Sequence, residues 1–233
     1  MKAIYFIYFM QFFNMLYISS MIGISLSMLF KYKKVTTSKK FFFFITVAFS
    51  LQAFGDTFSL TPFFFNFVNK IPYLNISIEG AGAFLSSLIF TIFYLILLES
   101  LRQFSEKKIN GQYIAIFIIG ILRIIVLFLP ANKWGTADGS MNLYYIRNGL
   151  LLMEIFAIGV LYVREAAIKN IPKFTTIGYT ILFAWACFFI IVFWSSKEPL
   201  VALLTIPKTI AHVVLGITFY KMFTMHDKTD YLV

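Results

Sequence analysis

Long apolar runs alternate with short polar segments along the whole 233-residue chain. An α-helix needs about 20 mainly apolar residues to cross a hydrocarbon layer about 30 Å thick. The pattern predicts seven membrane-spanning helices, at residues 4–30, 41–67, 80–98, 113–129, 144–163, 175–194 and 199–219. We therefore expect an all-α, polytopic membrane protein, folded as a single seven-helix transmembrane domain over residues 1–233.

The polar segments between the runs predict an orientation. The first run is longer than the apolar core of a cleaved signal peptide, so we interpret it as a span. The segment from Asn69 to Ser77 is polar and contains a proline, which predicts a loop. Connectors after spans one, three and five, with the tail, hold 13 Lys and Arg residues, against 4 in the amino terminus and the other three connectors. The positive-inside rule then predicts an outside amino terminus and a cytoplasmic carboxy terminus.

Composition supports the membrane class and excludes several others. The chain is 60% hydrophobic and 13% charged, whereas soluble domains average about 25% charged. The net charge of +10 would fit nucleic acid, but the positive charges lie mainly in the connectors of a multi-pass protein, so the predicted partner is the lipid bilayer of the cell membrane. The single cysteine, Cys187, excludes an internal disulfide, and two histidines, His212 and His226, are too few for a catalytic metal site.

Ionisable residues inside the apolar runs are the candidate chemistry. Lys208 lies ~14 Å along its helix from Pro199, near the middle of the bilayer, where an ammonium costs about 2.5–3.5 kcal/mol on insertion scales and needs a partner. His212, four residues later, lies on the same helix face. We predict a single polar ligand-binding site in the bundle, formed by Asp56, Arg123, Arg147, Glu154, Lys208 and His212.

The depths of these residues suggest pairs without deciding them. Asp56 and Arg147 belong to the outer half of the bilayer, which favours one pair between them. Glu154 is near the midplane and could be shared by Arg123 and Lys208. Three cations against two carboxylates leave one surplus positive charge, which either a neutral Lys208 or an anionic ligand would remove.

Two functional interpretations follow from that surplus. The first is a protein that binds or transports a small anionic or polar ligand. The second is a receptor or assembly subunit in which the charges are structural and hold the helices in register. Pro207 removes a backbone donor next to Lys208, so we also expect a kink or break in the seventh helix.

A lysine midway along the seventh of seven helices resembles the layout of retinal-binding rhodopsins. That resemblance implies a Schiff base on Lys208 and retinal as cofactor; without it the residues predict no cofactor. The third span, at Phe84–Tyr94, lacks the carboxylate that the family would place there.

The stretch Gly55–Leu60, Gly-Asp-Thr-Phe-Ser-Leu, resembles part of the lysoplasmalogenase membrane family. That resemblance implies hydrolysis of vinyl-ether lipids with participation of Asp56. The chain has no second intramembrane aspartate to complete the expected pair. Whether the protein is an enzyme is therefore left open.

The chain also resembles an uncharacterised group of bacterial multi-span membrane proteins. The matching segments lie in spans two, four to five and seven, and they are Gly55–Pro62, Leu129–Trp134, Ile146–Asn148 and Ile206–Ala211. Ser59 and Phe63 stand where that group tends to have a histidine and an arginine. The resemblance implies a multi-span fold and no particular activity.

Overall fold

The structure, a computed structural model, describes residues 2–35, 38–69, 72–134, 139–195 and 198–225, without the side chains of 2–7, 59–69, 72–77, 199 and 224–225. Its described elements are α1 (Lys2–Tyr32), α2 (Lys39–Asn69), α3 (Pro72–Ser105), α4 (Gly111–Leu127), η1 (Pro130–Asn132), α5 (Met141–Lys169), α6 (Pro172–Trp194), η2 (Pro199–Leu204) and α7 (Thr205–Met225). The described chain is thus all-α, as the apolar runs predict.

Local sequence signals explain where several helices begin and end. Asn110 caps α4, because its side chain accepts hydrogen bonds from the backbone N–H groups of Gln112 and Tyr113. Ser140 caps α5 in the same way through the N–H of Leu143. Asn170 ends α5 in the left-handed conformation that asparagine tolerates.

The loop expected between Asn69 and Ser77 is wrong for most of its length. α3 already begins at Pro72. Proline fits the first turn of a helix, where its missing N–H would have no intrahelical partner. Most of this polar segment therefore belongs to α3, which extends beyond its apolar run.

The seventh apolar run is a composite element, in agreement with the break expected near Pro207. Residues Pro199–Leu204 form the 3₁₀ helix η2, and α7 starts at Thr205. Pro207 lies in the first turn of α7, where a missing donor costs little. Lys208 therefore sits at the beginning of α7 and next to the change of helix type.

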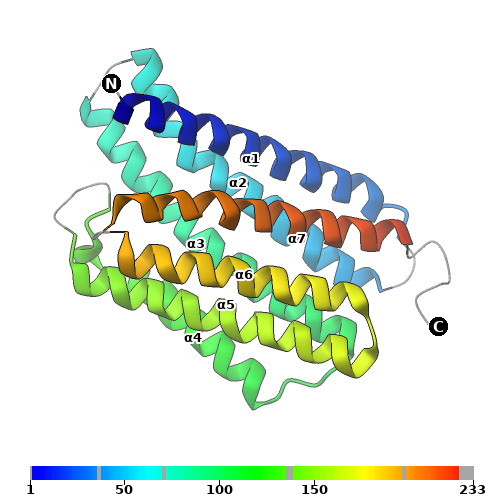
Figure 1. The fold of residues 1–233 in the computed structure, drawn as a ribbon. Helices are drawn as coiled ribbons and strands as arrows, with labels where there is room; N and C mark the ends of the chain where they lie inside the picture. The colour runs from blue at the N-terminus through cyan, green and yellow to red at the C-terminus, as the bar shows by residue number, and fades with distance from the viewer. Residues whose placement is uncertain (1, 36–37, 70–71, 135–138, 196–197, 226–233) are drawn as a thin grey trace.

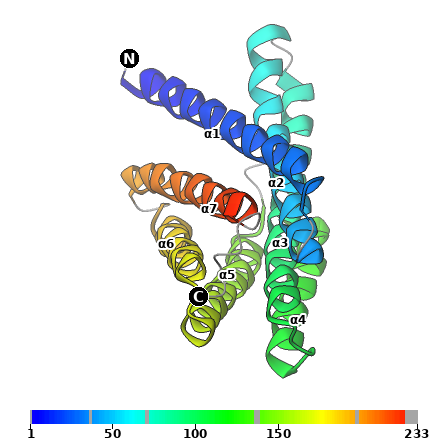
Figure 2. The ribbon, with the colours of Figure 1, turned by 90° about the vertical axis from the view of Figure 1, so that its right-hand side faces the viewer.

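The helices pack in two layers with one helix across them. Figure 2 shows α2, α3 and α4 on one side and α5, α6 and α7 on the other, and α1 packs against α2 and α7. Glycines allow close approach within the second layer: a Cβ on Gly178 of α6 would lie 2.8 Å from the backbone nitrogen of Val163 and 3.0 Å from the carbonyl oxygen of Gly159. Such contacts between backbones are typical of membrane helices.

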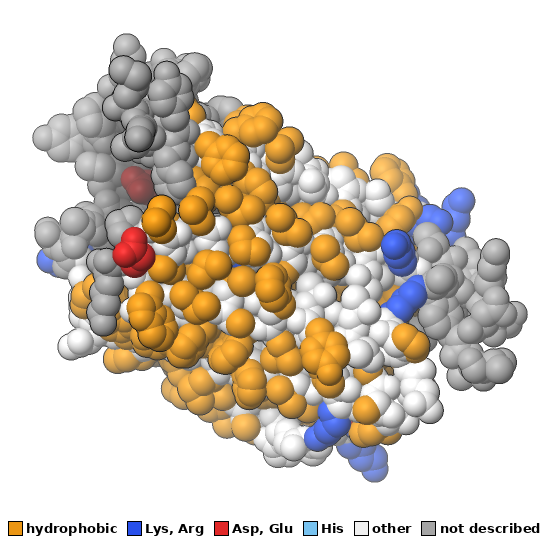
Figure 3. All heavy atoms as spheres, viewed as in Figure 1, with side chains coloured by type: hydrophobic (Ala, Val, Ile, Leu, Met, Phe, Trp, Pro, Cys, Tyr) orange, Lys and Arg blue, Asp and Glu red, His pale blue; other side chains and the backbone are white. Residues whose placement is uncertain are grey.

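Within the described residues, five helical segments are long and apolar enough to cross a membrane. They comprise α1, α2, α3, α6 and the segment Leu200–Phe223 that joins η2 to α7; α4 is a shorter apolar helix. Figure 3 shows apolar side chains over the middle of one face, with Lys and Arg at one end and acidic residues at the other. We call the end with the α1–α2, α3–α4 and α5–α6 connections the basic end (Figure 1) and the opposite end the cavity end.

The basic end has a tightly packed aromatic core. Phe41, Phe104 and Phe174 pack against one another with ring centroids 4.7–6.2 Å apart, and Phe219 and Tyr162 extend the cluster. Phe41, Phe174, Phe219 and Tyr162 are buried. Offset and edge-on contacts between rings add to the area that they bury.

Two carboxylates at the basic end, Glu165 and Glu99, are paired with cations. The fully buried carboxylate of Glu165 accepts hydrogen bonds from Lys107 and from Ser105, and Arg164 lies 3.7 Å away. Burial alone would raise the pKa of Glu165, but the hydrogen bonds from Lys107 and Ser105 outweigh it and lower the pKa. Glu99 accepts hydrogen bonds from Nη2 and Nε of Arg102, at 2.5 and 2.7 Å.

Candidate functional site

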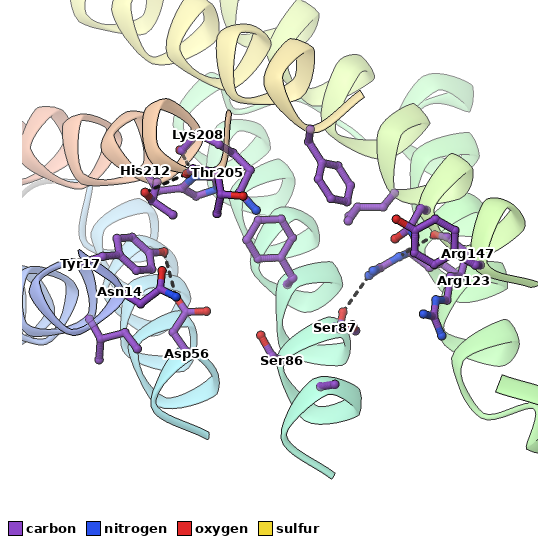
Figure 4. A pocket seen from close by; sticks show the side chains of 18 of the residues that line it. Asn14, Tyr17, Asp56, Ser86, Ser87, Arg123, Arg147, Thr205, Lys208 and His212 are labelled. Atoms are coloured by element: carbon purple, nitrogen blue, oxygen red, sulfur yellow. Dashed lines mark hydrogen bonds between the residues drawn. The ribbon is translucent and has the colours of Figure 1, made fainter. Parts of the chain in front are cut away.

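A cavity of about 410 Å³ lies between the helices towards the cavity end, and all seven α-helices contribute to its wall. Figure 4 shows its polar side chains in two groups, one around Asp56 and Lys208 and one around Arg123 and Arg147. Of the six residues expected to form a site, five line this cavity: Asp56, Arg123, Arg147, Lys208 and His212. Glu154 is not part of the wall.

Asp56 is held by neutral donors. The Tyr17 hydroxyl of α1 and the Gln52 amide of α2 both donate to its Oδ2, each at 2.8 Å. Gln52 is one helical turn before Asp56, and Tyr17 reaches it from the neighbouring helix (Figure 4). The Asp56 side chain is therefore fixed at the edge of the cavity by α1 and α2 together.

Lys208 faces the cavity without an acidic contact. It makes no ion pair and no side-chain hydrogen bond with any described residue. Its ammonium instead lies over the rings of Phe188 and Phe90, at 5.2 and 5.7 Å from the ring centroids. Asp56 is the carboxylate whose charge acts most on it, beyond ion-pair distance. Aromatic faces stabilise a cation only in part, so this site can accept an anion.

His212 joins Lys208 to the buried wall of the cavity. Its Nδ1 lies 2.8 Å from the Lys208 carbonyl oxygen, which can only accept, so Nδ1 carries the proton. Nε2 then accepts from the hydroxyl of Tyr94, 3.2 Å away on α3. The neutral ring thus has a defined tautomer and orientation.

Arg123 is almost fully buried, with 2% of its surface exposed. Its Nε donates to the backbone oxygen of Arg147 at 3.0 Å, and its Nη1 donates to the backbone oxygen of Ser87 at 2.8 Å and to Thr91 Oγ1. Nη2 has no hydrogen-bond partner among the described residues. Carbonyl oxygens of α3 and α5 thus position the guanidinium without neutralising its charge.

Arg147 is directed towards the connection between α4 and α5. Its Nη1 donates to Asn132 Oδ1 at 2.9 Å, and its guanidinium stacks over Trp134 at 4.1 Å from the ring centroid. Asn132 is itself fixed by donating to three backbone oxygens at the end of α4. Arg147 is thus a third cation, after Lys208 and Arg123, with no carboxylate in contact within the described chain.

Glu154 lies behind the wall, with 0% of its surface exposed. Neither of its carboxyl oxygens has a hydrogen-bond partner in the described part of the structure. Arg123 is the cation whose charge acts on it. A buried carboxyl group without hydrogen bonds is costly when ionised, which marks Glu154 as an unsatisfied buried group next to the site.

Of the pairs suggested by depth, the structure supports Glu154 with Arg123, whose charges act on each other, but not Asp56 with Arg147. Arg147 contacts Asn132 and Trp134, and Figure 4 places it across the cavity from Asp56. Asp56 instead interacts electrostatically with Lys208. Depth along a helix does not specify the direction in which a side chain points, and this direction decides the partner.

Several neutral residues of the site were not predicted. Tyr17, Gln52, Tyr94 and Asn132 position the charged groups, yet polar or aromatic residues of these types are common in apolar runs. The one available signal is the spacing of Gln52 and Asp56, four residues apart on one helix face. Among the described residues, no group of three His, Cys, Asp or Glu could hold a metal ion.

No protein-family model, curated protein or solved structure matches the chain. The resemblances to rhodopsins, lysoplasmalogenases and the bacterial multi-span group therefore gain no support from a match. The site has to be interpreted from its own geometry.

Proposed function

We propose that the protein is a seven-span protein of the cell membrane that binds a small anion in the cavity and passes it across the bilayer. The observation that carries this proposal is the Lys208 ammonium, which faces the cavity with aromatic rings and no acidic contact among the described residues. Arg123 and Arg147 add two more cations to the same wall, against one carboxylate, Asp56. An anion would balance this excess.

The two helices not counted among the long apolar segments fit the membrane as well. At 1.5 Å per residue the 17 residues of α4 extend about 25 Å, close to the hydrocarbon thickness. Exposed isoleucines, including Ile114, Ile118 and Ile125, cover its outer face. On α5, Met153, Phe156 and Val160 are exposed while Glu154 is buried. Both helices thus present an apolar face to lipid.

The proposed orientation has the amino terminus outside and the carboxy terminus in the cytoplasm. It is supported by the Lys and Arg residues at the basic end. In a Cys187→Ala background, a cysteine at Ser140 should react with a membrane-impermeant maleimide on intact cells, and one at Lys108 only after lysis. The reverse pattern would overturn this orientation.

Anion binding can be tested with purified protein in phosphatidylcholine nanodiscs. Sodium acetate, sulfate and phosphate are titrated at constant ionic strength while thermal unfolding is followed, because a ligand that binds only the folded state raises Tm. We expect at least one anion to raise the Tm of the wild type. In Lys208→Met and Arg123→Gln, the same rise in Tm should need an anion concentration at least ten times higher. Lys40→Met, which changes an exposed lysine at the basic end, is the matched control. Variants that fold and keep the full response would refute the proposal.

A further inference from the structure

Glu154 is a buried acidic residue that the anion site does not use directly. It is fully buried, its two carboxyl oxygens have no hydrogen-bond partner in the described structure, and it does not line the cavity. Arg123, which does line the cavity, is the cation whose charge acts on it. Arg123 therefore lines the candidate anion site and also acts electrostatically on a buried carboxyl group.

The electrostatic partners of Glu154 come from α3 and α4, two of the helices that pack against α5. Arg123 of α4 and Tyr94 of α3 are within electrostatic range of Glu154. On α7, His212 bonds to Tyr94, and the electrostatic neighbours of Lys208 are Asp56 and Cys187. On α5 itself, Arg147 acts on Arg123, and Glu165 is occupied by Lys107 at the basic end. Among these groups Arg123 is the cation that can balance an ionised Glu154.

Arg123 cannot balance two negative charges at once. With no ligand, the positive charge of Arg123 and the negative charge of an ionised Glu154 sum to zero. An anion bound at Arg123 Nη2, which has no partner among the described residues, would compete for the same guanidinium and leave Glu154 as a buried carboxylate without hydrogen bonds. Uptake of one proton by a Glu154 carboxyl oxygen removes that charge, and the sum over anion, Arg123 and Glu154 is again zero.

We infer that Glu154 is a proton-binding site coupled to the cavity, so that one proton from solution is taken up for each monovalent anion bound. The inference rests on the proposed function, because it concerns the same anion site, and it assigns the coupled ion. By linkage, the proton and the anion each increase the affinity for the other by the same factor. A transport cycle built on this site would move the anion together with a proton.

The test uses the full-length protein in nanodiscs with sodium acetate as the probe. Affinity is measured by thermal shift across about pH 6 to 9, where acetate itself stays ionised, and proton uptake is followed with a pH-indicator dye in weak buffer. For the wild type we expect one proton per anion, and a tenfold loss of affinity per pH unit where Glu154 changes its protonation state. Glu154→Gln should take up no proton and bind with an affinity independent of pH. Glu79→Gln, at an exposed glutamate of α3, should behave as the wild type.

The outcomes separate the two proposals. Wild-type binding without proton uptake and without pH dependence overturns the coupling and leaves the anion site standing. Proton uptake that persists in Glu154→Gln also overturns it, because Asp56 or His212 would then be the acceptor. If the wild type binds no anion, both proposals fall. Should Glu154→Gln not fold, infrared difference spectra of the wild type and of Asp56→Asn decide: a new carboxylic-acid C=O band on acetate binding that persists in Asp56→Asn supports the coupling, and its absence from either protein overturns it.

Discussion

Charged and aromatic side chains have different partners at the two ends of the bundle. At the basic end, Glu165 is buried in contact with Lys107, and phenylalanine rings fill the space between the helices. At the cavity end, Lys208 lies over two rings without an acidic contact in the described chain, and Glu154 is buried without a hydrogen bond. Satisfied groups stabilise a fold, whereas unsatisfied groups in a membrane mark functional sites.

This difference has a structural origin in the side chains of α3. Towards the cavity end, α3 contributes the small side chains of Ala83, Ser86 and Ser87 to the cavity wall, and these leave space between the helices. Further along, Phe93 and Leu97 of the same helix are fully buried in the core. Side-chain size along one helix thus changes the bundle from a hollow end to a filled end.

The largest expected effect is on the free energy of unfolding, when one phenylalanine at each end is replaced by alanine. Phe219→Ala removes a fully buried ring from the aromatic core and should lower the free energy of unfolding by about 3 kcal/mol. Phe188 borders an existing cavity, so its ring has fewer packing contacts to lose. Phe188→Ala should therefore lower the free energy of unfolding by less than about 1.5 kcal/mol. Unfolding of both variants in the same mixed micelles gives the comparison. Equal losses would mean that the cavity wall is packed as tightly as the core.

Much of this fold is predictable from the sequence, and the reason is the length of the apolar runs. Each of the seven runs predicts a helix, because backbone groups in lipid must be satisfied within the segment. The ends are less predictable: α3 begins at Pro72, within a segment whose polarity suggests a loop. Helix extensions beyond the apolar run depend on turn residues and capping rather than on hydropathy.

The candidate site is predictable only in its charged members. Ionisable residues are so rare in apolar runs that Asp56, Arg123 and Lys208 are apparent from the sequence, and all three line one cavity. Their partners are not apparent, because a partner depends on how each helix is rotated about its axis. Glu154 illustrates this limit, since its depth matches that of Lys208 but its side chain lies outside the wall.

Two lysine-to-methionine variants should change stability in opposite directions. Lys107→Met removes the main donor to the buried Glu165 and should cost about 1–2 kcal/mol. Lys208→Met removes a cation with no acidic contact in the described chain and should stabilise the anion-free protein by about 1 kcal/mol. Unfolding in buffer without small organic anions measures both. A loss of stability in Lys208→Met would show that this ammonium is already balanced.

The smallest effect is the pH dependence that Glu165 contributes at the basic end. Its pKa is lowered in the folded protein from the ordinary value of 4.5, so its contribution is present above that value and is lost as the pH falls through the folded pKa. We expect Glu165→Gln to cost about 1 kcal/mol at neutral pH and progressively less as the pH falls through the folded pKa of Glu165, below which the wild-type residue is protonated as well. Stability measured for both proteins across this range gives the difference directly. A difference that grows towards acid would mean that Lys107 and Ser105 do not favour the ionised carboxylate, and the contrast between the two ends would then disappear.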